Sequence, residues 1–377
     1  MKRRFAREWL LGSALLAGAL SAPGCGSSAH KKAVTEEAGE AGVSATAGAS
    51  DEVAGTGGDA GSPANAGTGG AVEAGAGGAP ADLGGSGGAP DETVVLPECE
   101  GELTFDDSNF EASVRAAVDI PEGPVTGADV ATIKVFTLLY QDGVTDITGI
   151  ECLSAIETLS FGVNGGGAKP LAALAALRKL RTLDLHDDYL DTDAIEGLAE
   201  VTQLTSLDLS GNFITSYAAL GSLVSLKTLK LDGNDNNSFI PIDATPLGEL
   251  TQLQTLTLDG ALIADIAPLS ALKKLESLSL AGVKLTSLSA LSKLTQLTSL
   301  DLSSTTITSV TELGALPAIQ SLWISNNPIA SLAPLVDSTF VAGGDEIYAE
   351  GLDCATFATA FTALTTKGVT LHTDCTP

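Results

Sequence analysis

One spacing of leucines dominates the second half of the 377-residue chain. A leucine followed two positions later by another apolar residue recurs at eight places, where the leucines are Leu159, Leu183, Leu207, Leu229, Leu256, Leu278, Leu300 and Leu322. Four of the seven steps between them are 22 residues long, two are 24 and one is 27. A repeat this regular restricts the chain to an architecture that stacks one structural unit many times.

Each copy is predicted to contribute one short strand to a shared sheet. Side chains alternate between the faces of a strand, so both apolar residues point inward and the residue between them points outward. A single copy cannot bury its own leucines, and the copies must therefore stack. The full pattern, L-x-x-L-x-x-L-x-L-x-x-N-x-I, is that of a leucine-rich repeat. We expect about eight repeats over 153–335, forming an α/β solenoid with a curved parallel sheet on the concave face and short helices or turns on the convex face.

A polar column marks the bend after each strand. Its residues are Asn164, Asp188, Asn212, Asn234, Ala261, Val283, Thr305 and Asn327. An asparagine there can bond to backbone groups that the turn would otherwise leave buried and unpaired. Ala261 and Val283 cannot, so we expect water or backbone pairing in their place. The fourth copy carries about five additional residues near 235–239, which are expected to bulge as a loop.

Both ends of the repeat array carry sequences suited to covering the open ends of a solenoid. In the N-terminal cap, 97–152, the segment from Ser108 to Glu111 predicts a capping box that opens a helix, and the segment from Thr126 to Asp129 repeats this start signal loosely. In the C-terminal cap, 336–377, we expect a helix over about 355–367 and a final strand over 368–372.

Four of the five cysteines lie in these caps. Four cysteines permit three pairings. Cys99 and Cys152 bracket the N-terminal cap, whereas Cys354 and Cys375 bracket the C-terminal helix and strand, so we assign one disulfide to each pair. A metal or nucleophile role for these thiols is disfavoured, because no C-x-x-C pair or adjacent histidine accompanies them.

The first 25 residues have the layout of an export signal, with a basic start and an apolar stretch from Trp9 to Leu20 that is too short to span a bilayer. Small residues and then Cys25 follow, which resembles a bacterial lipoprotein signal and implies acylation of Cys25. An ordinary secretory signal with an incidental Cys25 is the alternative. Residues 26–96 are rich in Gly and Ala and lack apolar periodicity, so we expect a disordered tether there.

The charge balance limits the partners. Lys and Arg total 19 against 47 Asp and Glu, which gives a formal net charge of −28. A surface this acidic repels phosphate backbones, so nucleic-acid binding is disfavoured. One Met and three His leave little for redox or metal chemistry. We expect no cofactor.

The outward residues of the strands define the candidate binding face. The central column is Ser160, Asp184, Asp208, Lys230, Thr257, Ser279, Asp301 and Trp323, and the second column is Gly162, His186, Ser210, Asp232, Asp259, Ala281, Ser303 and Ser325. We predict ligand contacts at Asp184, His186, Asp208, Lys230, Asp232, Thr257, Asp259, Asp301 and Trp323.

Carboxylates should adjoin one another on this face. Neighbouring strands lie ~4.8 Å apart, so Asp184 should lie beside Asp208, and Asp232 beside Asp259. Paired carboxylates can hold Ca²⁺ or act as an acid/base pair. A solvated acidic face, with Lys230 relieving part of the repulsion, is the preferred interpretation. No nucleophile accompanies the acids, so we expect neither catalysis nor a resident metal, with Ca²⁺ as the alternative.

Two side chains on this face need a separate interpretation. His186 lies beside several carboxylates but has no second histidine nearby, so it is interpreted as a surface residue rather than a metal ligand. Trp323 projects outward, where the core does not need it. Tryptophan anchors commonly dominate protein interfaces, which favours a ligand contact. Packing of Trp323 against the C-terminal cap is the alternative.

The 22-residue period, the two-helix preface and the sequence DITGIECLSAIETLSF at 146–161 resemble the internalin type of bacterial leucine-rich repeat protein over about 105–375. The resemblance implies a helical N-terminal cap and protein ligands on the concave face. This chain differs in having few aromatic residues on that face.

These observations predict an exported, lipid-anchored bacterial surface protein that binds a protein ligand noncovalently on the concave face, as a monomer and without enzymatic activity. A passive structural protein of the envelope and a glycan-binding or Ca²⁺-dependent adhesin are the alternatives. Gly26 follows Cys25, where an aspartate would retain some lipoproteins at the inner membrane. The resemblance to lipoproteins therefore favours the outer membrane or cell surface.

Overall fold

The structure, a computed structural model, describes residues 99–138, 143–161, 171–234, 240–263 and 265–375. All of them fall within one compact unit, Gly85–Pro377. Several predicted features lie outside the described residues: the export signal with Cys25, the tether at 26–96, Gly162, Asn164 and the loop at 235–239.

A single parallel sheet organises this unit. Its eleven strands follow one another in chain order. They are β1 (Val135–Thr137), β2 (Thr158–Ser160), β3 (Thr182–Asp184), β4 (Ser206–Asp208), β5 (Thr228–Lys230), β6 (Thr255–Thr257), β7 (Ser277–Ser279), β8 (Ser299–Asp301), β9 (Ser321–Trp323), β10 (Glu346–Tyr348) and β11 (Thr370–His372). Each leucine of the repeat pattern is the buried central residue of one of the strands β2 to β9. The predicted leucine-rich repeat fold is therefore confirmed.

The sheet extends beyond the predicted repeats at both ends. β1 pairs with β2, and β10 pairs with β9, in the same parallel register as the other strands. The leucine pattern does not predict these two strands, because other apolar residues, such as Ile347 and Ala349 after β9, occupy the inward positions. The predicted final strand is confirmed at Thr370–His372, where β11 pairs with β10.

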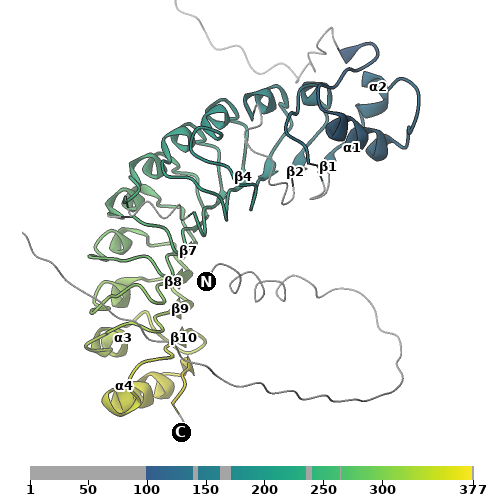
Figure 1. Ribbon diagram of the computed structural model, residues 1–377. Coiled ribbons are helices and arrows are strands. Elements are labelled where there is room, and N and C mark those ends of the chain that lie inside the picture. The colour runs from purple at the N-terminus through teal and green to yellow at the C-terminus, as the bar shows by residue number, and fades with distance from the viewer. Residues whose placement is uncertain (1–98, 139–142, 162–170, 235–239, 264, 376–377) are drawn as a thin grey trace, which may run out of the picture. The chain divides into compact units, whose positions relative to one another are not determined.

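Short 3₁₀-helices return the chain on the opposite side of the core. Figure 1 shows them on the outer side of the curved stack, with the strands on its inner side. They are η3 (Ile150–Cys152), η4 (Leu171–Ala176), η5 (Glu196–Glu200), η6 (Ala218–Ser222), η7 (Thr245–Glu249), η8 (Ala267–Ala271), η9 (Leu291–Lys293) and η10 (Leu313–Ala315). Leucines in and after these turns, among them Leu220, Leu223 and Leu226, are fully buried. Each such side chain contributes roughly 1.5 to 3 kcal/mol of burial free energy.

The asparagines of the bend column bond to backbone groups, as predicted. The amide nitrogen of Asn212 donates to the Leu185 carbonyl oxygen at 2.8 Å, and its amide oxygen accepts from the Leu190 N–H at 2.9 Å. Both partners belong to the preceding copy, so one side chain ties two copies together. Asn234 and Asn327 make corresponding bonds to the copies before them.

Backbone pairing replaces the asparagine at the fifth and sixth copies, as expected. The N–H of Ala261 donates to the Leu258 carbonyl oxygen at 3.0 Å, and the N–H of Val283 donates to the Leu280 carbonyl oxygen at 3.0 Å. These bonds stay within one copy. The side-chain ties between copies are therefore interrupted at the two bends.

The bends also carry a column of residues with positive φ. The leucine pattern does not predict this column. Its members are Asp187, Gly211, Gly233, Gly260, Gly282, Ser304, Asn326 and Gly351. Most are glycine, because a residue without a Cβ adopts this conformation without a steric penalty. At Gly211 a Cβ would also lie 1.9 Å from Oδ1 of Asp187, so close packing between copies adds to the requirement.

The N-terminal helices confirm one start signal and correct the other. Helix α1 (Ser108–Val118) has Asp107 as its N-cap, one residue before the predicted capping box, and the Asp107 carboxylate accepts from two backbone N–H groups of the first turn. An aspartate at this position competes well with a serine one residue later. Helix α2 (Gly127–Val130) begins as predicted, with the Asp129 carboxylate accepting from the Thr126 N–H at 2.8 Å.

The C-terminal end is covered by α3 (Ala333–Asp337) and α4 (Cys354–Thr366), and α4 confirms the helix predicted over about 355–367. Both disulfides form as assigned, Cys99–Cys152 at the N-terminal end and Cys354–Cys375 at the C-terminal end. Among the described residues, no helix is both long enough and apolar enough to cross a membrane.

Replacing Asn212 by alanine should weaken the stack at one bend. The change leaves the Leu190 N–H and the Leu185 carbonyl oxygen without their side-chain partner, and each buried group left unpaired costs about 1 to 3 kcal/mol. We expect the free energy of unfolding in urea, followed by circular dichroism, to fall by about 2 to 4 kcal/mol. Thr251→Ala at an exposed position is the control and should change little. Equal stabilities of the two variants would contradict the role assigned to the amide.

Candidate ligand-binding face

Three columns of outward residues run along the face of the sheet that is turned away from the 3₁₀-helices. The central and second columns are those predicted from the sequence. The third column precedes the central leucines and carries a hydroxyl in every strand from β2 to β9: Thr158, Thr182, Ser206, Thr228, Thr255, Ser277, Ser299 and Ser321. In the sequence, this column appears as a Thr or Ser directly before each central leucine. Our predictions did not include it.

The predicted ligand contacts lie on this face, on strands β3 to β9 and on the turns directly after them. The register places Asp184 opposite Asp208, as predicted. Lys230 is exposed and the other predicted contacts are half-buried. Ser325 of the second column is only 5% exposed, because its hydroxyl donates to the carboxylate of Glu350 on the turn after β10, which covers it.

Strands β3 to β5 carry an ion-paired cluster. Nζ of Lys230 lies 3.1 Å from Oδ2 of Asp208, which confirms that this lysine relieves part of the repulsion. Nδ1 of His186 lies 2.6 Å from Oδ1 of Asp184, and the Ser160 hydroxyl donates to Oδ2 of the same carboxylate at 3.3 Å. Each aspartate of this cluster therefore has a basic partner within the chain.

The pKa shifts in this cluster follow from the pairing. Partial burial lowers the pKa of His186, but the hydrogen bond and the negative charge of Asp184 outweigh it and raise that pKa above 6.5. Burial raises the pKa of Asp208, but hydrogen bonds from Ser210 and Lys230 outweigh it and lower that pKa. Both shifts favour the charged forms of the paired side chains.

Strands β5 to β7 hold the second predicted pair of carboxylates. Oδ2 of Asp232 accepts from the Thr257 hydroxyl at 2.7 Å, and its Oδ1 accepts from the Asp259 N–H at 2.9 Å. Oδ1 of Asp259 accepts from the Ser279 hydroxyl at 2.5 Å and from the Ala281 N–H at 2.9 Å. Burial, together with the charge of Asp232, raises the pKa of Asp259. A Ca²⁺ ion would have to displace these donors, and calcium binding stays the untested alternative to a solvated acidic face.

Trp323 begins an aromatic stack that continues into the C-terminal cap. Its ring centroid lies 4.8 Å from that of Tyr348, with 9° between the ring planes, and Tyr348 lies 4.1 Å from His372 at 5°. The register of β9, β10 and β11 places the three side chains at equivalent positions of consecutive strands. Packing of Trp323 against the cap is therefore confirmed, and its contact with a ligand stays a prediction. Tyr348 was missed because the leucine pattern does not reveal β10. His372 lies on the predicted final strand, but its place in the stack depends on β10 and was missed for the same reason.

A second aromatic pair, also missed, lies at the bends. Tyr189 and Phe213 follow the bend residues of two consecutive copies and are 58% and 41% exposed, with ring centroids 5.8 Å apart. In the sequence, this pair appears only as an aromatic residue directly after the bend residue in two consecutive copies.

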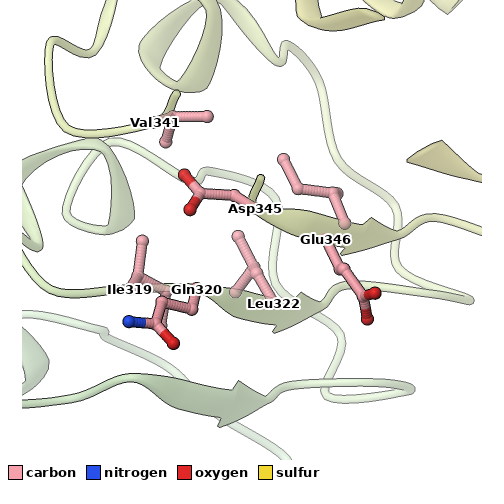
Figure 2. Close-up of a pocket in the computed structure, with 7 residues that line it drawn as sticks. Ile319, Gln320, Leu322, Val341, Asp345 and Glu346 are labelled. Atoms are coloured by element: carbon pink, nitrogen blue, oxygen red, sulfur yellow. The ribbon is translucent and has the colours of Figure 1, made fainter. Parts of the chain in front are cut away.

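The candidate site is an open face rather than a cavity. Figure 2 shows a hollow between β9 and β10 that is lined by Ile319, Gln320, Leu322, Val341, Asp345, Glu346 and Ile347. Its volume of about 10 Å³ is at the lower limit for one water molecule. Its lining includes the exposed Gln320 and the half-buried Asp345 and Glu346, and none of the predicted ligand contacts lines it.

The pairing of His186 with Asp184 predicts a measurable titration. Because the pKa of His186 is raised in the folded state, the protonated form contributes stability that is fully present below pH ~6.5 and is lost as the pH rises through the raised pKa. An NMR titration should give a pKa above 6.5, and Asp184→Asn should lower it. His186→Gln identifies the resonance. The same pKa in wild type and Asp184→Asn would contradict the pairing.

Family models agree with this architecture. A model described as "Leucine Rich repeats (2 copies)" matches residues 295–336, and a model described as "Leucine rich repeat" matches residues 171–235. No curated protein matches the chain.

Two solved structures that the chain matches are internalins from Listeria monocytogenes. An internalin (inlF) is 25% identical over 71% of this chain and 76% of its own, with a TM-score of 0.58. An internalin named inlC2 is 28% identical over 62% of this chain and 91% of its own, with a TM-score of 0.44. The chain therefore contains leucine-rich repeats, and its fold is similar to that of an internalin.

Proposed function

We propose that this chain is an exported, lipid-anchored surface protein that binds a protein ligand noncovalently on the inner face of its sheet. The observation that carries the proposal is the continuous polar face formed by the three outward columns. From β2 to β11 the sheet takes nine steps between neighbouring strands, which at ~4.8 Å each give a face roughly 43 Å long. A face of this size suits a protein interface.

The similarity to internalins supports a protein as the ligand. The resemblance in the sequence implies protein ligands on the concave face, and the aromatic stack at Trp323 supplies a residue type that commonly dominates such interfaces. A glycan or a Ca²⁺-dependent contact would use the same face. A passive structural protein of the envelope would not need it.

The geometry favours binding over catalysis. Along the described face, Asp184 and Asp208 have basic partners, and Asp232 and Asp259 accept hydrogen bonds from the sheet. Catalytic acids and bases act within hydrogen-bond reach of a substrate held in a recess, whereas these carboxylates line an open face. We therefore propose a binding protein without enzymatic activity or a resident cofactor, acting as a monomer.

The N-terminal sequence supports attachment to a membrane. Acylation of Cys25 would bury more than one acyl chain, which stable anchoring requires. The 71 residues from 26 to 96, if disordered, have a typical reach of roughly 45 Å. That reach would hold the repeat domain clear of the surface. Gly26 after Cys25 favours the outer membrane or cell surface.

Crosslinking on intact cells that export the full chain should capture a partner protein. The double variant Trp323→Ala with Asp208→Lys should reduce the yield by about ten-fold or more, because it removes an aromatic anchor and reverses a charge on the face. The matched control is Phe340→Ala with Asp265→Lys, which also removes one aromatic side chain and reverses one aspartate charge, at exposed positions outside the three columns. Equal yields from the two double variants would contradict binding on this face and favour the passive structural role.

Labelling of cells with radioactive palmitate tests the anchor separately. Wild-type protein should carry the label and partition with membranes, and Cys25→Ala should lose both properties while the protein is still exported. Cys25→Ser is a second variant without an acceptor thiol and should behave in the same way. Label retained after either substitution would show that Cys25 is not the site of acylation.

A further inference from the structure

The indole of Trp323 has one covered ring face and one that is turned toward β8. Tyr348 of β10 stacks on the first face at 4.8 Å. The opposite face points to β8, where Asp301 is the partner of Trp323 in the register. An aspartate side chain reaches less far from the sheet than an indole, so the outer part of this ring face extends above Asp301. Both residues are half-buried rather than buried.

Asp301 presents a carboxylate beside this ring face. Its Oδ1 accepts from the Ser303 N–H at 2.8 Å. In the part of the chain that the structure describes, Oδ2 has no hydrogen-bond donor, and no Lys or Arg pairs with this carboxylate. Asp301 thus differs from Asp208, whose charge is paired with Lys230.

The surrounding half of the face carries an uncompensated negative charge. On the outward columns of β6 to β11, including the turn after each strand, the described acidic residues are Asp259, Asp301, Glu346, Glu350 and Asp374, and these columns contain no Lys or Arg. A cationic ligand would relieve this repulsion, and the electron-rich face of an indole attracts a cation as well.

We propose that Trp323 and Asp301, which are register partners on β9 and β8, together bind an arginine side chain from a basic segment of the protein ligand, with the guanidinium stacked on Trp323 and hydrogen-bonded to Asp301. This inference rests on the proposed function and specifies the chemistry of the partner. A guanidinium fits better than an ammonium, because it is planar, stacks on aromatic rings and donates hydrogen bonds from its edge at the same time.

Tyr348 acts as a positioning residue for the indole of Trp323. Its hydroxyl donates to Oε2 of Glu346 at 2.8 Å, which fixes the phenol ring against the indole. His372 supports the other side of the phenol ring at 4.1 Å. The stack therefore holds the indole of Trp323 in place beside Asp301 before any ligand arrives, which lowers the ordering cost of binding.

Tryptophan fluorescence tests the proposal directly. The sequence has two tryptophans, so in the full chain carrying Trp9→Phe all tryptophan emission comes from Trp323. Titration with an amidated hexa-arginine peptide should change this emission saturably. Hexa-lysine should bind more weakly, and hexa-glutamate should have no effect. Asp301→Asn should weaken hexa-arginine binding about five-fold.

Asp265→Asn is the matched control, since it removes the same charge at an exposed position outside the face. Tyr348→Ala should weaken binding by releasing the indole, whereas Tyr348→Phe should retain most of the affinity because the stack remains. Circular dichroism of each variant establishes that the fold is retained. If Asp301→Asn proves misfolded, Asp301→Ser supplies the same comparison.

Equal affinities of Asp301→Asn and Asp265→Asn, or binding without a change in Trp323 emission, would overturn the proposal, since attraction to the overall negative charge would then explain the binding. A change in emission caused by a neutral hexasaccharide but not by hexa-arginine would also overturn it, in favour of a glycan. In either case, continued loss of capture in the Trp323→Ala, Asp208→Lys variant on cells would leave the proposed function standing.

Discussion

The structure depends on the fact that one repeat cannot bury its own leucines. Leu183 is covered only when Leu207 of the next copy lies beside it, and the parallel register brings the two residues together. Burial of apolar surface thus fixes the alignment of every strand with the next. The polar face is a consequence of that alignment, because residues at equivalent positions of successive copies must form columns.

These columns divide the face into two electrostatically different halves. At β3 to β5, Lys230 forms an ion pair with Asp208, and the ring of His186 forms a hydrogen bond with Asp184. From the turn after β6 onward, the carboxylates accept hydrogen bonds from hydroxyl and backbone N–H groups. Burial and the charge of Asp232 raise the pKa of Asp259. Hydrogen bonds position a carboxylate without removing its charge, so the second half attracts cations more strongly than the first.

The leucine spacing predicted the strands of the repeats and the order of residues along their face, and the positions of the cysteines predicted the disulfides. Together they located the central residues of β2 to β9, the pairs of adjoining aspartates and both disulfides. The leucine spacing did not reveal β10, because Ile347 replaces the leucine, and so it missed the stacking partner of Trp323. The burial of Ser325 was also beyond reach, since it depends on Glu350 of a strand–turn unit that carries no leucine signal. Periodicity predicts the residues inside a copy well, but contacts with an unrecognised copy remain hidden.

The distribution of asparagines along the bends has a mechanical consequence. The side-chain amides of Asn212, Asn234 and Asn327 donate hydrogen bonds to the copy before them. Ala261 and Val283 have no side-chain group that could do so. The bend residues of the fifth and sixth copies therefore make no side-chain hydrogen bond to the copy before them. Flexing of the arc at these bends would change the angle between the ion-paired half of the face and the half that carries the Trp323 stack, and so change how closely both halves can contact one ligand.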